Sequence, residues 1–258
     1  MSDGRIWPVA SAIAWRTTRN AFRSRAVLLP MFLFPLFFLT AFAGGLSQIR
    51  ELPGFDYPGD YLGFQFAFVL LQAGAFGGVF TGFSVARDFE SGIAKRLLLA
   101  APNRVGIVIG YALAALLRWA LVASVLTVVS LLVGMEVGGT LPDIVGMYTL
   151  AALLNVAAFM WSCGIAMRLR TVQAGPLMQM PVFLILFFAP VYVPLELLRG
   201  WIHGVARVNP VTYVLEAARS LLAGDPVGVA TAFLVGLCFA AVLSVWALRG
   251  LRRAEAAG

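Results

Sequence analysis

Residues 61–86 read YLGFQFAFVLLQAGAFGGVFTGFSVA and contain no charged side chain. Apolar runs of about 18 or more residues are typical of transmembrane helices, because in lipid the backbone polar groups must bond within the segment. Similar runs recur along the chain, so we expect spans at 26–46, 61–86, 105–135, 144–167, 174–194 and 226–248. The predicted fold is an all-α integral membrane protein with six transmembrane helices, forming a single domain over residues 1–258.

The composition indicates the same fold class. Of the 258 residues, 61% are apolar and 12% are charged, and the mean hydropathy is +0.91. Soluble domains carry about twice this share of charge. A soluble globular domain and a disordered chain are therefore excluded, and 2 cysteines exclude a disulfide scaffold. Six spans also leave no room for a second, soluble catalytic domain.

The distribution of charge predicts the orientation. Most basic residues fall before the first span or after the second, fourth and sixth spans, and most acidic residues fall in the other loops. By the positive-inside rule, both termini lie in the cytoplasm. The net charge of +7 then reflects topology and contact with anionic lipid rather than nucleic-acid binding. One lysine against many arginines, with abundant alanine and glycine, indicates a high-GC bacterium, and hence a multi-pass protein of the bacterial cytoplasmic (inner) membrane.

The residues before the first span predict a further helix. Over residues 7–25, Arg16, Arg19 and Arg23 share one narrow helical face, whereas Trp7 and Trp15 lie largely elsewhere. This pattern favours a cytoplasmic amphipathic helix at the membrane interface; the alternative is a positively charged topology anchor. A signal peptide cleaved near residues 41–43 is a weaker alternative, because the apolar run is too long for one.

The loop after the second span predicts a short cytoplasmic helix. Asp88 and Glu90 precede it, where the positive end of a helix favours acids, and Ser91 is a candidate N-cap. Pro102 ends the helix. Its apolar face, which would need a partner groove or the membrane interface, consists of Ile93, Leu97, Leu98 and Ala101.

Between the fifth and sixth spans the chain is too polar for a simple span. Residues 194–207 can form one short helix, and Asn209 and Pro210 supply the N-cap and first position of another, which stops at Gly224. Within it Glu216 and Arg219 are spaced to pair. The simplest interpretation of this segment is an interfacial hairpin with no further role.

These two segments resemble the membrane subunits (permeases) of type-2 ABC exporters, including the daunorubicin-resistance-like drug exporters. One carries Glu90-Ser91-Gly92-Ile93, then residues 97–102 as LLLAAP and Gly110, with Ile93 in place of the usual Thr; the other carries residues 209–213 as NPVTY and 217–222 as AARSLL. The resemblance covers nearly the whole chain, including the six-span layout.

The resemblance implies a role for each segment. The short helix would be the coupling helix seated on an ATP-binding partner subunit, with the coupling residues Asp88, Glu90, Gly92, Ile93, Leu97, Leu98 and Pro102. The second segment would form short outer re-entrant helices that close the pathway, with the gate residues Asn209, Pro210, Tyr213, Glu216 and Arg219.

Within the spans, one charge and two glycine patterns are notable. Arg118 lies about midway along the third span, where a charge is by default a functional hypothesis. It could pair inside a dimer, meet an anionic substrate, or snorkel inward from a span that begins near Leu116. Glycines at helical spacing predict close helix packing; they are Gly74, Gly78, Gly82, Gly106 and Gly110.

The sequence lacks the residues that nucleotide binding, metal binding and nucleophilic catalysis require. A P-loop needs Gly-Lys-Ser/Thr, but the only lysine, Lys95, lies between Ala94 and Arg96. His203 has no companions at metal-ligand spacing, and no serine-nucleophile motif occurs. We therefore expect no enzyme, no catalytic residue, no metal site and no cofactor in this chain, with ATP and Mg²⁺ bound by the partner subunit.

The leading hypothesis is an export permease for a lipophilic drug-like or lipid substrate. Its expected partners are an ABC ATPase subunit, a second permease subunit as homodimer or heterodimer, and membrane lipids, but not nucleic acid. The alternatives are an exporter of a lipid-linked glycan or polysaccharide, a non-transporting membrane-anchor or sensor subunit of an ABC complex, and, with least support, an intramembrane enzyme.

Overall fold

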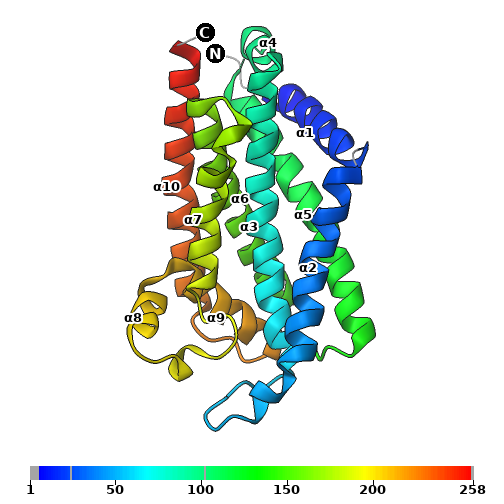
Figure 1. Ribbon diagram of the computed structural model, residues 1–258, viewed down its shortest axis with the longest axis vertical. Helices are drawn as coiled ribbons and strands as arrows, with labels where there is room; N and C mark the ends of the chain where they lie inside the picture. Colours follow the sequence, from blue (N-terminus) through cyan, green and yellow to red (C-terminus); the bar gives the residue numbers. More distant parts are fainter. Residues whose placement is uncertain (1–5, 24, 102, 257–258) are drawn as a thin grey trace.

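The computed structural model describes residues 6–23, 25–101 and 103–256 (Figure 1). Over these residues the chain is built from helices and connecting loops without a strand, which confirms the all-α class. The α-helices are α1 (Ile6–Arg23), α2 (Arg25–Gly45), α3 (Tyr61–Glu90), α4 (Ile93–Ala100), α5 (Val105–Val133), α6 (Leu141–Leu169), α7 (Gly175–Phe187), α8 (Trp201–Val208), α9 (Pro210–Ala223) and α10 (Val229–Ala256). The 3₁₀ turns are η2 (Ser47–Glu51), η3 (Val172–Ala174) and η4 (Leu195–Leu197).

The long helices run side by side and define two ends of the bundle (Figure 1). Helices α1 and α4 and the last turns of α10 lie at one end, called here the α4 end. Helices α8 and α9 and the loop after α2 lie at the opposite end, called the α9 end. The two terminal helices thus reach the same end of the molecule.

Helix α3 is the centre of the bundle and packs against α2, α5, α6, α7 and α9. Its closest partner is α6, and the glycines predicted to pack lie on this contact. A Cβ atom on Gly74 would lie 3.0 Å from the carbonyl oxygen of Ala151, and one on Gly78 would overlap the backbone of Asn155 and Phe159. The absence of side chains at these positions lets the two backbones approach.

A second glycine contact joins α1 to α5. A Cβ atom on Gly106 would lie 3.1 Å from the carbonyl oxygen of Ile6, and one on Gly110 would lie 2.8 Å from Cβ of Ile13. The amphipathic helix predicted over residues 7–25 is therefore present as α1, but its buried face packs on α5 rather than lying only on a lipid interface. Trp7 remains exposed on the other face.

Within the part of the chain that the structure describes, four helices are long and apolar enough to cross a membrane: α3, α5, α6 and α10. They correspond to the predicted spans 61–86, 105–135, 144–167 and 226–248, although α3 extends to Glu90. Helix α2 covers nearly all of the span predicted at 26–46, and it includes the apolar stretch Leu29–Gly45. The number of six spans stays a prediction.

The span predicted at 174–194 is wrong in its second half. Helix α7 has 13 residues and ends at Phe187, so it covers about 20 Å, less than the hydrocarbon core of about 30 Å. The uncharged run continues, but Pro190 disfavours helical backbone at Ala189 and brings no amide hydrogen of its own. Residues beyond α7 bond instead to side chains of other helices.

We predict that Gly78→Ala destabilises the protein. The added methyl group meets backbone atoms of α6 that cannot move aside like a flexible side chain. Overpacking of this kind costs about 1–3 kcal/mol, more than the gain in helix propensity. Thermal unfolding in detergent measures the effect. Gly236→Ala on α10 is the control, because its Cβ would meet only ordinary contacts at 3.6 Å. Equal melting temperatures for the two variants would contradict the close approach.

Candidate functional site

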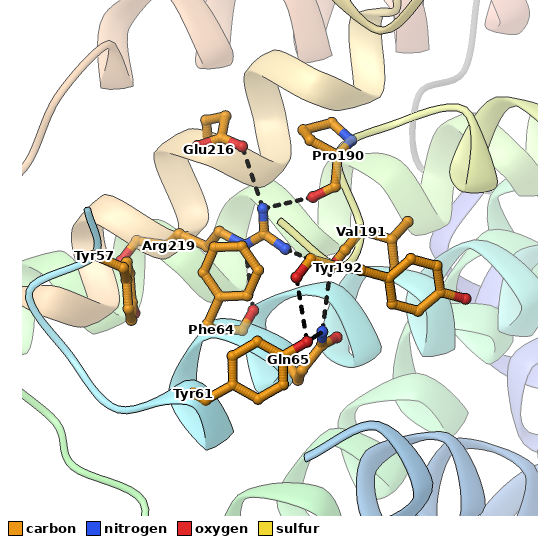
Figure 2. A network of polar contacts seen from close by, with 9 residues as sticks. All are labelled: Tyr57, Tyr61, Phe64, Gln65, Pro190, Val191, Tyr192, Glu216 and Arg219. Carbon is orange, nitrogen blue, oxygen red and sulfur yellow. Dashed lines mark hydrogen bonds and ion pairs between the residues drawn. The ribbon is translucent and has the colours of Figure 1, made fainter. Parts of the chain in front are cut away.

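A buried arginine organises the α9 end of the bundle (Figure 2). Arg219 on α9 is 1% exposed. Its Nε donates to the carbonyl oxygen of Phe64 at 3.2 Å, its Nη1 to that of Pro190 at 2.7 Å, and its Nη2 to that of Val191 at 2.9 Å. Nη1 also donates to Glu216 at 3.2 Å, which is the pair predicted from the i, i+3 spacing. One guanidinium therefore joins α9 to α3 and to the segment after α7.

Neighbouring residues reinforce this attachment. The hydroxyl of Tyr61 donates to the carbonyl oxygen of Tyr192 at 3.2 Å. Nε2 of Gln65 donates to the Tyr61 hydroxyl at 2.7 Å and to the carbonyl oxygen of Val191 at 3.3 Å (Figure 2). We call residues 190–192 with Tyr61, Gln65 and Arg219 the Arg219 clamp. In this clamp, Tyr61, Gln65 and Arg219 donate hydrogen bonds to the carbonyl oxygens of residues 190–192, which have no helical partners.

Two aromatic side chains contact Arg219. The Arg219 guanidinium carbon lies 3.4 Å from the ring centroid of Phe64, which is a cation–π contact. The hydroxyl of Tyr57 donates to the Arg219 carbonyl oxygen at 3.3 Å. Burial raises the pKa of Tyr57, so that this hydroxyl remains a neutral donor.

The other residues predicted to form the gate lie in different places. Asn209 caps α9 by accepting from the amide of Val211 at 2.9 Å, and its Nδ2 donates to the carbonyl oxygen of Ile185 on α7 at 2.6 Å. Pro210 is the first residue of α9. Tyr213 is half-exposed and donates to the Arg207 carbonyl oxygen, so it lies outside the clamp. The structure therefore brings Asn209 to α7 and Arg219, with its partner Glu216, to residues 190–191, and leaves Tyr213 apart.

At the α4 end, two acidic residues tie α3 to its neighbours. Asp88 accepts from Nη2 of Arg16 on α1 and from the hydroxyl of Tyr111 on α5. Glu90 accepts from the Thr171 hydroxyl and from the amide of Val172, both at 2.8 Å, in the turn between α6 and α7. The last turn of α3 is thus attached to α1, α5 and the α6–α7 turn together.

This arrangement corrects the predicted position of Asp88 and Glu90 relative to the helices. Asp88 and Glu90 belong to the last turn of α3 rather than to the start of the short helix, and Ser91 ends α3 instead of capping α4. Gly92, with φ of +74°, is the N-terminal cap of α4. Such a φ suits glycine and allows the sharp change of direction between the two helices.

The short helix α4 divides its apolar residues between the bundle and the surface. Ala94 is buried, and Leu97 and Leu98 pack partly against the core. Ile93 is 38% exposed and Leu99 is 72% exposed. The surface available to a partner therefore contains Leu99, which the sequence analysis missed because it grouped Leu97 and Leu98 as the outward face. Pro102 lies outside the described residues.

Arg118 lies inside the bundle. It occupies the middle of a continuous α5 and is 5% exposed. Its Nε donates to the Ala114 carbonyl oxygen at 3.2 Å and its Nη2 to the Thr81 hydroxyl on α3. Its side chain therefore lies against α3 rather than at an end of the bundle. Within the described ranges, no group of three or more His, Cys, Asp or Glu residues is placed to hold a metal ion.

The comparison with known proteins identifies the class of membrane protein. Residues 9–223 match the family of ABC-2 type transporters, and the chain belongs to this family. Over 204 residues it is 26% identical to the daunorubicin resistance ABC transporter permease protein DrrB1 of Streptomyces coeruleorubidus, an alignment that covers 77% of this chain and 67% of that protein. The chain is thus a type-2 ABC permease and a multi-pass membrane protein.

We predict that Arg219→Gln destabilises the α9 end. The shorter amide cannot reach all three carbonyl oxygens, and each buried acceptor left without a donor costs about 1–3 kcal/mol. The melting temperature in detergent should fall, and a cysteine placed at Tyr192 should become more reactive toward a water-soluble maleimide. Arg207→Gln is the matched control, because the Arg207 side chain is exposed. If both variants behave alike, the clamp does not hold this segment.

Proposed function

We propose that the chain is the permease subunit of an ATP-driven exporter that moves a lipophilic drug-like or lipid substrate out of the cell. The observation that carries this proposal is the family match over residues 9–223. The similarity to a protein named as a daunorubicin resistance permease favours a lipophilic substrate. In this scheme two permease subunits, identical or paralogous, enclose the pathway, and the surrounding lipids are the third partner.

We infer that a separate ATPase subunit supplies the energy by docking on α4. Exposed leucine and isoleucine side chains on a short helix at the end of the bundle are suited to a hydrophobic groove on a partner, and Leu99 is the most exposed of them. Lys95 and Arg96 beside them add positive charge. The ATPase subunit would bind ATP and Mg²⁺, and this chain would contribute no cofactor ligand.

The contacts of Asp88 and Glu90 suggest how movement of α4 would spread. A displacement of α4 would act on the last turn of α3, to which α1, α5 and the α6–α7 turn are bonded. ATP binding would favour one of two arrangements of the permease dimer by making better contacts with it. The Arg219 clamp at the other end of α3 would then be the gate.

This proposal includes an orientation. The positive-inside rule places the α4 end, with both termini, in the cytoplasm and the Arg219 clamp at the outer face of a bacterial inner membrane. Helices α8 and α9 would then be the re-entrant pair. Non-helical backbone at membrane depth needs protein partners, and the hydrogen bonds of residues 190–192 meet this need.

Two other functions share the same fold. An exporter of a lipid-linked glycan or polysaccharide would use the same ATPase contact, and a membrane-anchor or sensor subunit would bind the ATPase without moving a substrate. Transport by the chain and its ATPase in proteoliposomes, measured with a lipophilic dye and with a labelled lipid-linked glycan, separates these three. ATP-dependent movement of neither compound would favour the anchor or sensor subunit.

We predict that Leu99→Asp weakens association with the ATPase subunit at least about ten-fold, because it places a charge in an apolar contact. Co-purification and the stimulated rate of ATP hydrolysis measure the effect. Leu52→Asp at the α9 end is the control, since Leu52 is also exposed and lies outside α4. Leu97→Asp is a poorer test because Leu97 packs against the core. Unchanged association of the Leu99→Asp variant would overturn the assignment of α4 as the docking helix.

A further inference from the structure

A cavity of about 270 Å³ lies between α2, α3 and α5. Its wall is largely apolar, and its polar groups come from a few side chains. A cavity of about 150 Å³ already accepts a benzene ring, so this one has room for a substantial part of a small lipophilic molecule. The aromatic residues that line it are Phe34, Phe76, Phe80, Phe83 and Trp119.

Arg118 brings a positive charge to the wall of this cavity without an acidic partner. A guanidinium has five N–H donors, and hydrogen bonds to Ala114 and Thr81 use two of them. Throughout the described residues, no carboxylate forms an ion pair with Arg118. A buried charge in this condition is unfavourable unless an anion joins it.

Gln72 is a second unsatisfied group on the same wall. It is fully buried, and neither its Nε2 nor its Oε1 has a hydrogen-bond partner among the described residues. Buried amides are nearly always bonded. Gln72 lies nine positions before Thr81, the partner of Arg118, which is about 13 Å along α3. It therefore marks a separate polar point in the otherwise apolar wall.

The lining residues of α3 extend along one helix from Gln72 to Arg87. They are separated by 15 positions, which at 1.5 Å per residue is about 22 Å. Arg87 is exposed at the α4 end, so one long wall carries positive charge within the bundle and at its rim. This shape and charge suit an elongated molecule with an acidic group.

A second copy of this chain cannot easily supply the missing anion. Two copies in the same membrane orientation place equivalent residues at equal depth, and Arg118 lies near the middle of α5. Asp88 and Glu90 lie in the last turn of α3 and already have partners within the chain. Glu136 and Asp143 lie at the turn between α5 and α6. In a dimer of identical chains, the anion would therefore come from a ligand.

We propose that this cavity binds an anionic amphiphile, with its carboxylate or phosphate oxygens against Arg118 and its apolar part along the phenylalanine wall. Charge-assisted hydrogen bonds from arginine to such oxygens are stronger than bonds between neutral groups. The inference that this ligand is the exported substrate rests on the proposed function. The inference that the cavity binds it depends only on the cavity.

The test is binding of radiolabelled oleate, compared with oleyl alcohol, to the full chain in phosphatidylcholine nanodiscs. We expect oleate to bind at least about ten-fold more tightly than the alcohol. Arg118→Gln should abolish this preference, and Arg118→Lys, which keeps the charge, should retain part of it. Arg207→Gln, outside the cavity, should have no effect. Melting temperatures identify variants that fail to fold.

Three outcomes overturn the proposal: equal binding of oleate and the alcohol, a full preference in a folded Arg118→Gln variant, or the same loss in the Arg207→Gln control. Competition by phosphatidylglycerol distinguishes the two sources of the acidic group. Displacement of oleate identifies an anionic membrane lipid, and failure to displace it identifies a free lipophilic acid. Binding without ATP-dependent transport would leave the site in place and contradict the exporter instead.

Discussion

The architecture depends on how the protein provides hydrogen bonds to the backbone that follows a helix ending within an apolar stretch. Helix α7 ends at Phe187, and the carbonyl groups beyond it need donors that lipid cannot supply. Arg219 provides them to Pro190 and Val191 while also bonding to Phe64 on α3. Pro190 disfavours continuation of α7, and this one guanidinium attaches the residues that follow it to α3 and α9. Its charge is shared among carbonyl dipoles, an aromatic ring and the half-exposed Glu216.

Much of the fold could be predicted because membrane helices are set by composition over long windows. The uncharged run at 61–86 and its counterparts located α3, α5, α6 and α10. The α7 boundary could not be read in this way, since the run remains apolar past Pro190 and the bonds that replace the helix come from Arg219, almost thirty positions away. The hydropathy of a segment indicates whether lipid or water surrounds it. It does not indicate which distant side chains form hydrogen bonds with its backbone.

The same limit applies to the sites. The Asn209 cap and the Glu216–Arg219 pair are local, and the sequence identified both. Asp88 is different, because its partners Arg16 and Tyr111 lie on other helices and become neighbours only when α1 packs on α5. Local reasoning therefore assigned Asp88 to α4. Arg118 stood out as an unusual charge, but the cavity and the unsatisfied Gln72 in its wall exist only in the folded bundle.

Helix α3 is 30 residues long, or about 45 Å, whereas a typical hydrocarbon core is about 30 Å thick. The helix is therefore about 15 Å longer than this core when it stands upright, and the excess along the membrane normal is smaller when it tilts. The position of α4 relative to the headgroups would then depend on lipid chain length, since a thicker bilayer covers more of α3. Bilayer thickness is thus a variable that would change how far the α4 surface extends toward the aqueous phase.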